Sequence, residues 1–115
     1  MRLRSTVAAA FGALALIVAV PTSAGAASGD FSYTYSGLNG SPRIGILFDP
    51  PSRVCLTLPE VADPHSSSPA HTPWNHTDAT ATVFTGVDCE GDHFSLRPYG
   101  GHASSRLKLR SVVFS

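Results

Sequence analysis

The chain has 115 residues, of which 14% are charged, and it contains eight basic residues, eight acidic residues and two cysteines. A chain of this length is expected to form one small domain. Its balanced charge argues against a general nucleic-acid-binding protein, which needs a basic surface to displace counterions from phosphate.

Residues 1–27 have the pattern of a secretory signal peptide. Arg2 and Arg4 give a positive start, residues 6–20 are uncharged and apolar, and Ala24-Gly25-Ala26 supplies the small residues that signal peptidase recognises. The apolar stretch would span about 22 Å as a helix, short of the ~30 Å hydrocarbon core, which disfavours the alternative of a retained membrane anchor. We expect a secreted, extracellular protein whose mature part, residues 28–115, is a single β domain. The mature part would have no membrane attachment and a net charge near −2, because Arg2 and Arg4 are removed.

The two cysteines, Cys55 and Cys89, allow one intramolecular pairing, and an exported chain meets conditions that favour a disulfide. The core of so small a domain is marginal by itself, so a crosslink would supply much of its stability. The alternative is two free thiols acting as metal ligands. It is disfavoured because neither cysteine has a second Cys or a His at Cys-x-x-Cys spacing.

The first half of the mature segment predicts three strands. No helical period is present, and prolines and glycines divide the chain into short runs. Residues 31–35 alternate aromatic and small polar side chains, as a strand with one buried face does, and Asn39-Gly40 favours a turn after them. Two further strands are expected at residues 43–48 and 53–58.

Residues 59–73 differ from what precedes them. The part from 63 to 73 contains three prolines, three consecutive serines and two histidines, with almost nothing to bury. It predicts a long, mobile surface loop, of the kind with which small secreted inhibitors present a binding segment. Trp74 ends it, either as a plug that packs the loop onto the domain or as an exposed anchor for a partner. His65, His71 and Trp74 are therefore the candidate binding residues.

The second half predicts strands at residues 80–84, 93–96 and 106–114. The apolar alternation shifts phase between Leu109 and Val112, which predicts a bulge near Arg110 and Ser111. Asn75-His76-Thr77 matches a glycosylation sequon, but its Asn and Thr are expected to close a turn before the strand at residue 80. About six or seven strands would form a two-sheet sandwich.

Four residues in this half occur in a recognisable order: Phe84, Cys89, Gly91 and Ser111. The order resembles the Greek-key motif of the βγ-crystallin superfamily, with an aromatic residue, four residues, Phe, any residue, Gly, and later a Ser before the last strand. Here Cys89 stands at the Phe position. The resemblance implies an all-β, βγ-crystallin-like Greek-key sandwich with one disulfide and a long Pro/Ser-rich loop. It further implies that Phe84 packs in the domain, that Gly91 takes strained backbone in a folded hairpin, that Ser111 bonds the hairpin's backbone, and that Cys89 is buried. Cys55 is expected to be buried as well, because it lies in the middle of the strand predicted at residues 53–58.

The chain lacks the calcium-site pattern of microbial members of that superfamily, which use an acidic or amide doublet, two spacers and a Ser or Thr. Residues 107–111 read Leu-Lys-Leu-Arg-Ser, which would repel a cation. The histidines lack the spacing of a structural zinc site, and no motif of a hydrolase or a phosphate-binding loop occurs. We expect no metal, no cofactor and no enzymatic activity.

The chain also resembles small secreted actinobacterial proteins, some of which are classed with bacterial peptidase inhibitors of βγ-crystallin-like fold. This resemblance implies a monomer that binds a protein partner, with a secreted peptidase as the expected target. The alternative is a structural or stress-related extracellular or envelope protein without an enzyme target.

Overall fold

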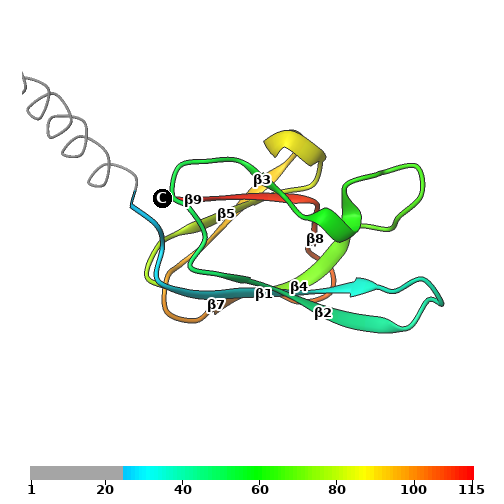
Figure 1. Ribbon diagram of the computed structural model, residues 1–115, viewed down its shortest axis with the longest axis horizontal. Coiled ribbons are helices and arrows are strands. Elements are labelled where there is room, and N and C mark those ends of the chain that lie inside the picture. Colours follow the sequence, from blue (N-terminus) through cyan, green and yellow to red (C-terminus); the bar gives the residue numbers. More distant parts are fainter. Residues whose placement is uncertain (1–24) are drawn as a thin grey trace, which may run out of the picture.

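The computed structural model describes residues 25–115, which form two antiparallel β-sheets packed face to face (Figure 1). The expected signal peptide, apart from residues 25–27, lies outside the described residues. The strands are β1 (Gly29–Ser36), β2 (Pro42–Phe48), β3 (Leu56–Thr57), β4 (Ala70–Thr77), β5 (Ala81–Phe84), β6 (His93–Leu96), β7 (Gly101–His102), β8 (Lys108–Leu109) and β9 (Ser111–Phe114), with two short 3-10 turns, η1 (Pro59–Val61) and η2 (Val87–Cys89).

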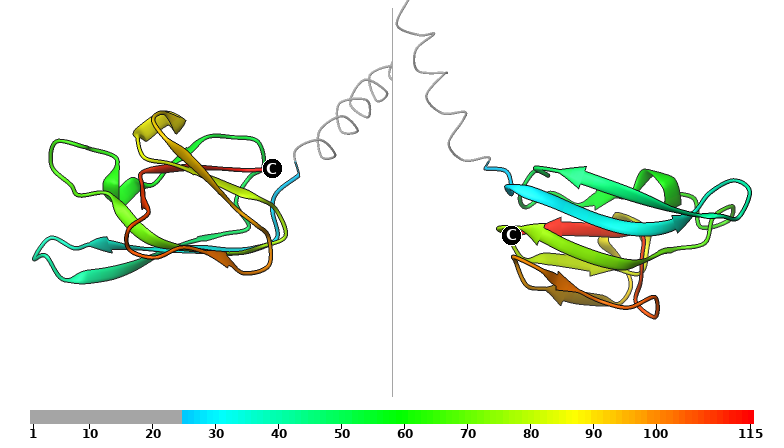
Figure 2. Two further views of the ribbon diagram at one scale, coloured as in Figure 1. Left: turned by 180° about the vertical axis from the view of Figure 1, so that it is seen from behind. Right: turned by 90° about the horizontal axis from the view of Figure 1, so that it is seen from below.

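The two sheets exchange strands between the halves of the chain. The first sheet has the order β2-β1-β4-β7, with β8 also paired to β4, and the second has the order β3-β9-β5-β6. Thus β7 joins a sheet built mainly from the first half, and β3 joins a sheet built from the second. Figure 1 shows the two layers one above the other, and the view from below in Figure 2 shows β2, β1 and β4 of the first sheet side by side.

The core lies between the layers and is formed by the inward-facing residues of both sheets. Phe31 of β1 and Phe114 of β9 meet edge to face with ring centroids 5.4 Å apart, so each sheet contributes one ring to the centre. Other large buried apolar side chains are Tyr33, Leu58, Val61, Val83, Leu109 and Val112. The all-β, two-sheet class expected from the sequence is therefore confirmed.

Tyr33 extends from this core toward the surface over Gly45 of β2, where any side chain would collide with its ring. Its hydroxyl donates a hydrogen bond to Glu60 Oε1 at 2.7 Å. Burial, and then the bond to the Glu60 carboxylate, raise the pKa of Tyr33 above its ordinary value.

Several predicted strands are confirmed within two residues, but three predictions about the chain path are wrong. The strand expected at residues 53–58 shortens to β3, because Arg53 adopts a positive φ of 61° and turns the chain. The long loop is shorter than expected, because its last residues join β4, which begins at Ala70. The strand expected at residues 106–114 is two strands in different sheets, and the chain passes between the sheets at Arg110, where a bulge was predicted.

The Cys55–Cys89 disulfide is present, with the Cα atoms 6.0 Å apart. Its expected burial is wrong for Cys55, which is exposed, while Cys89 is half-buried. The physical reason is position: Cys55 precedes β3 at the edge of the second sheet, where no further strand covers it. The bridge fastens that edge to η2.

Candidate binding surface

The face of the first sheet that points away from the core carries aligned side chains from four strands. Strand pairing places them in three rows across the sheet: Phe48–Asp30–His76, Ile46–Ser32–Trp74–His102, and Ile44–Thr34–His71. A register shift in the pairing of β1 with β4, between Ser32 and Thr34, brings His71 into the third row. We call this set of side chains the outer face.

Trp74 lies near the centre of the outer face and is 40% exposed. Its ring stacks on His102 of β7, with centroids 4.4 Å apart and planes at 19°, and on His76 of β4, with centroids 5.4 Å apart and planes at 29°. Two imidazoles therefore restrict the orientation of the indole. Of the two roles considered for Trp74, an internal plug or an exposed anchor, its position agrees with the anchor.

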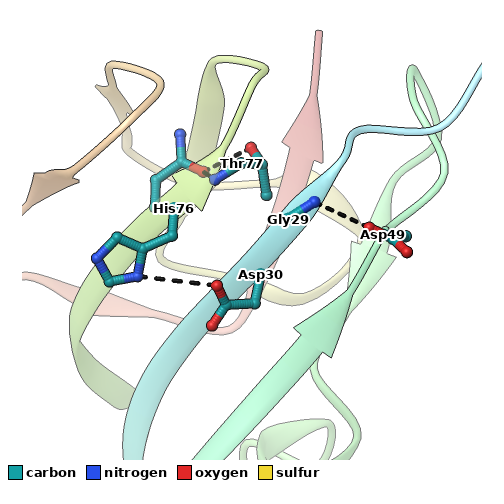
Figure 3. A network of polar contacts seen from close by, with 6 residues as sticks. Gly29, Asp30, Asp49, His76 and Thr77 are labelled. Atoms are coloured by element: carbon teal, nitrogen blue, oxygen red, sulfur yellow. Dashed lines mark hydrogen bonds and ion pairs between the residues drawn. The ribbon is translucent and has the colours of Figure 1, made fainter.

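His76 also faces a carboxylate from the neighbouring strand (Figure 3). Its Nδ1 lies 3.9 Å from Asp30 Oδ1 of β1, and both side chains are partly exposed. The same close-up shows Asp49 Oδ1 accepting the Gly29 N–H, which fastens the end of β2 to the start of β1. An exposed pair at such a distance adds little stability, about 0–1 kcal/mol at most, but it gives the Trp74 cluster a polar rim.

The part of the outer face on β2 is apolar. Ile44 is 62% exposed, Ile46 44% and Phe48 73%. Together with Trp74 they are half of the eight large apolar side chains exposed among residues 25–115. Clustering of this kind on one face marks an interaction surface more often than scattered exposed residues do.

The three residues selected from the sequence fall in two places. His71 and Trp74 both lie on β4, and His71 is half-buried, with its Nδ1 2.7 Å from Thr72 Oγ1. His65 lies in the preceding loop, where its N–H donates to Asp63 Oδ1. The expected binding loop is thus divided between a strand and a turn.

The loop at residues 62–69 is ordered by its own hydrogen bonds. Asp63 accepts bonds from the His65 N–H and the Ser66 hydroxyl, and these two bonds, in that order, lower the pKa of its carboxyl. Arg110 reaches the loop from the crossing point between the sheets and donates to Val61 O at 2.9 Å and to Ser67 O at 2.8 Å. The loop is therefore anchored by the guanidinium of Arg110.

The residues of the crystallin-like motif surround a hairpin at residues 85–92. Ser111 is fully buried; its Oγ donates to Gly86 O at 2.6 Å and accepts the Cys89 N–H at 2.8 Å. Gly91 has a φ of 88°, in the region that favours glycine. Phe84 is half-buried and pairs with Ser111 on one side and His93 on the other. These residues support the backbone and present no exposed binding group of their own.

Asn75 occupies an internal position on β4 and has no exposed surface. Its amide nitrogen donates to the carbonyl oxygens of Ala79, Leu96 and Arg97, and its oxygen accepts the N–H and hydroxyl of Thr77. The turn expected from Asn75 and Thr77 is present. Because both amide atoms are used, the sequon is closed in the folded domain.

Residues 25–115 contain no group of three or more His, Cys, Asp and Glu side chains close enough to hold a metal ion. Within the same residues, no helix is long and apolar enough to cross a membrane. The polar groups of the outer face are imidazoles, hydroxyls and one carboxylate placed side by side around an indole. Such groups can stack, donate and accept hydrogen bonds at a contact surface.

Comparison with known families, curated proteins and solved structures found no match to this chain. The outer face and the loop at residues 62–69 are therefore the features of the molecule from which a function can be proposed.

Proposed function

We propose that this protein is a secreted, non-enzymatic binding domain that engages a protein partner through the outer face around Trp74. The observation that supports it is the half-exposed indole stacked between His76 and His102. Tryptophan is among the residues most enriched at the energetic centres of protein interfaces. An indole already restricted by two neighbours loses less side-chain entropy on binding than a free one.

The proposal includes a βγ-crystallin-like Greek-key fold. In a Greek key the fourth strand returns beside the first, giving the order 4-1-2-3. The first sheet contains β4-β1-β2, and β3, the third strand of that half, lies in the second sheet. The second sheet contains β9-β5-β6, and β7, the third strand of that half, lies in the first sheet. Under this proposal the chain holds two related Greek-key halves, and only the second carries the residue order that resembles the motif.

A narrower form of the proposal is inhibition of a secreted peptidase through the loop at residues 62–69. The anchoring of this loop by Arg110 favours it, because an inhibitory segment must keep one conformation while bound. A panel of secreted serine and metalloproteases, assayed with micromolar mature protein, tests this form. Inhibition that weakens in Arg110→Ala supports it, and activity unchanged across the panel removes it without affecting the outer-face proposal.

The outer-face proposal is tested by affinity capture from culture supernatant with residues 28–115 as bait. Three baits are compared: the wild type, Trp74→Ala, and Leu38→Ala as a control, because Leu38 is a fully exposed apolar residue in the turn between β1 and β2. The proposal expects a protein captured by the wild type and the control but lost with Trp74→Ala. Equal capture by all three contradicts it, and no specific capture favours the alternative of a structural extracellular protein without a target.

A further inference from the structure

β2 forms one edge of the first sheet. Within residues 25–115 it pairs with β1 alone, so one side of its backbone has no strand beside it. Figures 1 and 2 show this strand at the margin of its layer, next to β1. An open edge is a template for pairing with another chain, and proteins usually protect such edges with charge, proline or a bulge.

Hydrogen bonds at the two ends of the β1–β2 hairpin identify the open backbone groups. The Asp49 N–H donates to Gly29 O, and the Gly37 N–H donates to Ser41 O. Bonded positions alternate along an antiparallel pair, so the odd-numbered residues of β2 direct their backbone groups to β1. The even-numbered Ile44, Ile46 and Phe48 direct their N–H and C=O groups away from the sheet.

The same three residues carry the exposed apolar side chains of β2, and this strand has few protective features. Its one charged residue, Arg43, lies near its start, and its prolines lie at the limits, with Pro42 as the first residue and Pro50 just beyond the end. Pro42 has no N–H, and a φ of 45° at Asp49 turns the chain, so Pro42 and Asp49 bound the usable edge. Between them lie three donors, three acceptors and an apolar row.

We propose that β2 pairs with β2 of a second copy of this chain, antiparallel and about a twofold axis at Ile46, joining the two first sheets into one. This register places Ile46 opposite Ile46 and Ile44 opposite Phe48 of the second copy, so every outward N–H meets a carbonyl. The pairing ends at Pro42, which has no donor to lose, and at Asp49, where a φ of 45° turns the chain. A shift of two residues in one direction sets Pro42 opposite Phe48, which needs a partner, and a shift in the other direction places Ile44 beyond the end of the second copy's strand.

Side chains favour the same register. It sets Ile44 opposite Phe48 and Ile46 opposite Ile46 of the second copy, and symmetry repeats the first of these pairs. All three side chains are exposed. Apolar residues therefore meet apolar residues, so the edge is complementary to itself.

The dimer does not depend on the proposed function and leaves its surface free. Trp74 lies on β4, separated from β2 by β1, so pairing at β2 covers neither the indole nor its two imidazoles. Two Trp74 clusters would lie on one continuous outer face and could bind a repeated partner. The proposed dimer differs from the monomer expected from the sequence.

The oligomeric state tests the dimer, measured on residues 28–115 by light scattering and sedimentation. We expect a dimeric wild type, a monomeric Ile46→Lys and a dimeric Phe94→Lys. The last is the matched control, an exposed apolar residue on β6, the edge of the second sheet. Circular dichroism should show both variants folded. A wild type that stays monomeric up to about 1 mM overturns the proposal, and it would assign the edge to a strand of another protein. An Ile46→Lys variant that is as dimeric as the control also overturns it.

Crosslinking tests the register. Residues directly opposite in a bonded antiparallel pair have Cα atoms about 5.5 Å apart, within disulfide reach. Ile46→Cys should therefore give a covalent dimer on mild oxidation, whereas Ile44→Cys, which lies opposite Phe48, should not. Equal crosslinking of the two variants contradicts an axis at Ile46.

Discussion

Removal of the disulfide is the perturbation whose magnitude can best be worked out. Cys55 and Cys89 are separated by 34 positions, and closing a loop of that length restricts the unfolded chain by about 3.8 kcal/mol in the chain-entropy model. Burial adds little, because Cys55 is exposed and Cys89 is half-buried, so truncation leaves no large void. Cys55→Ala/Cys89→Ala should lose about 3–4 kcal/mol of unfolding free energy, equivalent to a fall in Tm of roughly 15–30 °C.

The assay is urea and thermal unfolding of residues 28–115, followed by circular dichroism. The control is the wild type reduced with a phosphine, which loses the crosslink but keeps both sulfur atoms. We expect the reduced protein and the double variant to agree within about 1 kcal/mol. A double variant less than about 1 kcal/mol weaker than the oxidised protein would refute the entropic reasoning.

Three further predictions concern buried polar groups. Asn75→Asp places a charge against the three carbonyl oxygens that accept bonds from the amide, and it should lower the free energy of unfolding in urea by about 3–5 kcal/mol. The control, Asn39→Asp in an exposed turn, should lower it little, and equal losses in the two variants would contradict this reasoning. Ser111→Ala leaves a backbone donor and acceptor of the hairpin without their partner and should cost about 2–3 kcal/mol, with a change below ~0.5 kcal/mol as the contrary result. The raised pKa of Tyr33 means that the unfolded chain loses its phenol proton near pH 10 before the folded domain does, so this contribution to stability is present below about pH 10 and lost above it. Tyr33→Phe should therefore flatten the decline of unfolding free energy above about pH 10, and an unchanged slope would show that Tyr33 is not its source.

Strands with a local signal could be predicted from the sequence. Residues 31–35 alternate large and small side chains, and Asn39-Gly40 marks the turn, so the β1–β2 hairpin follows from short-range patterns. The phase shift of the apolar alternation near Arg110 can also be seen in the sequence. The sequence does not show that the chain passes from one sheet to the other there, because a bulge in one strand and a passage between two sheets give the same local pattern.

β4 could not be predicted for a physical reason. Its inward positions include Pro73, a residue that argues against a strand, and the polar residues Asn75 and Thr77, so no apolar alternation marks a buried face. Asn75 is stable there because carbonyl oxygens from distant segments accept its amide protons. Such partners are fixed by the fold, so a single sequence shows only a polar stretch that resembles a loop.

The outer face could not be predicted for the same reason. Trp74 is a candidate from the sequence, but His76 and His102 lie 26 positions apart and meet around it only because β4 pairs with β7. The exposed side of β2 could have been suspected from its apolar residues on both faces, Ile44 and Ile46 on one and Leu47 on the other. That pattern is shared with fully buried strands and does not by itself indicate an open edge.

The most direct test of the central claim is a binding titration of the captured partner with wild type, Trp74→Ala and Leu38→Ala, measured by calorimetry. If the stacked indole is the centre of the interface, Trp74→Ala should weaken binding by at least about 2 kcal/mol, roughly 30-fold in Kd, while Leu38→Ala matches the wild type. A Trp74→Ala domain that is folded and binds with the affinity of the wild type would show that the partner is held elsewhere.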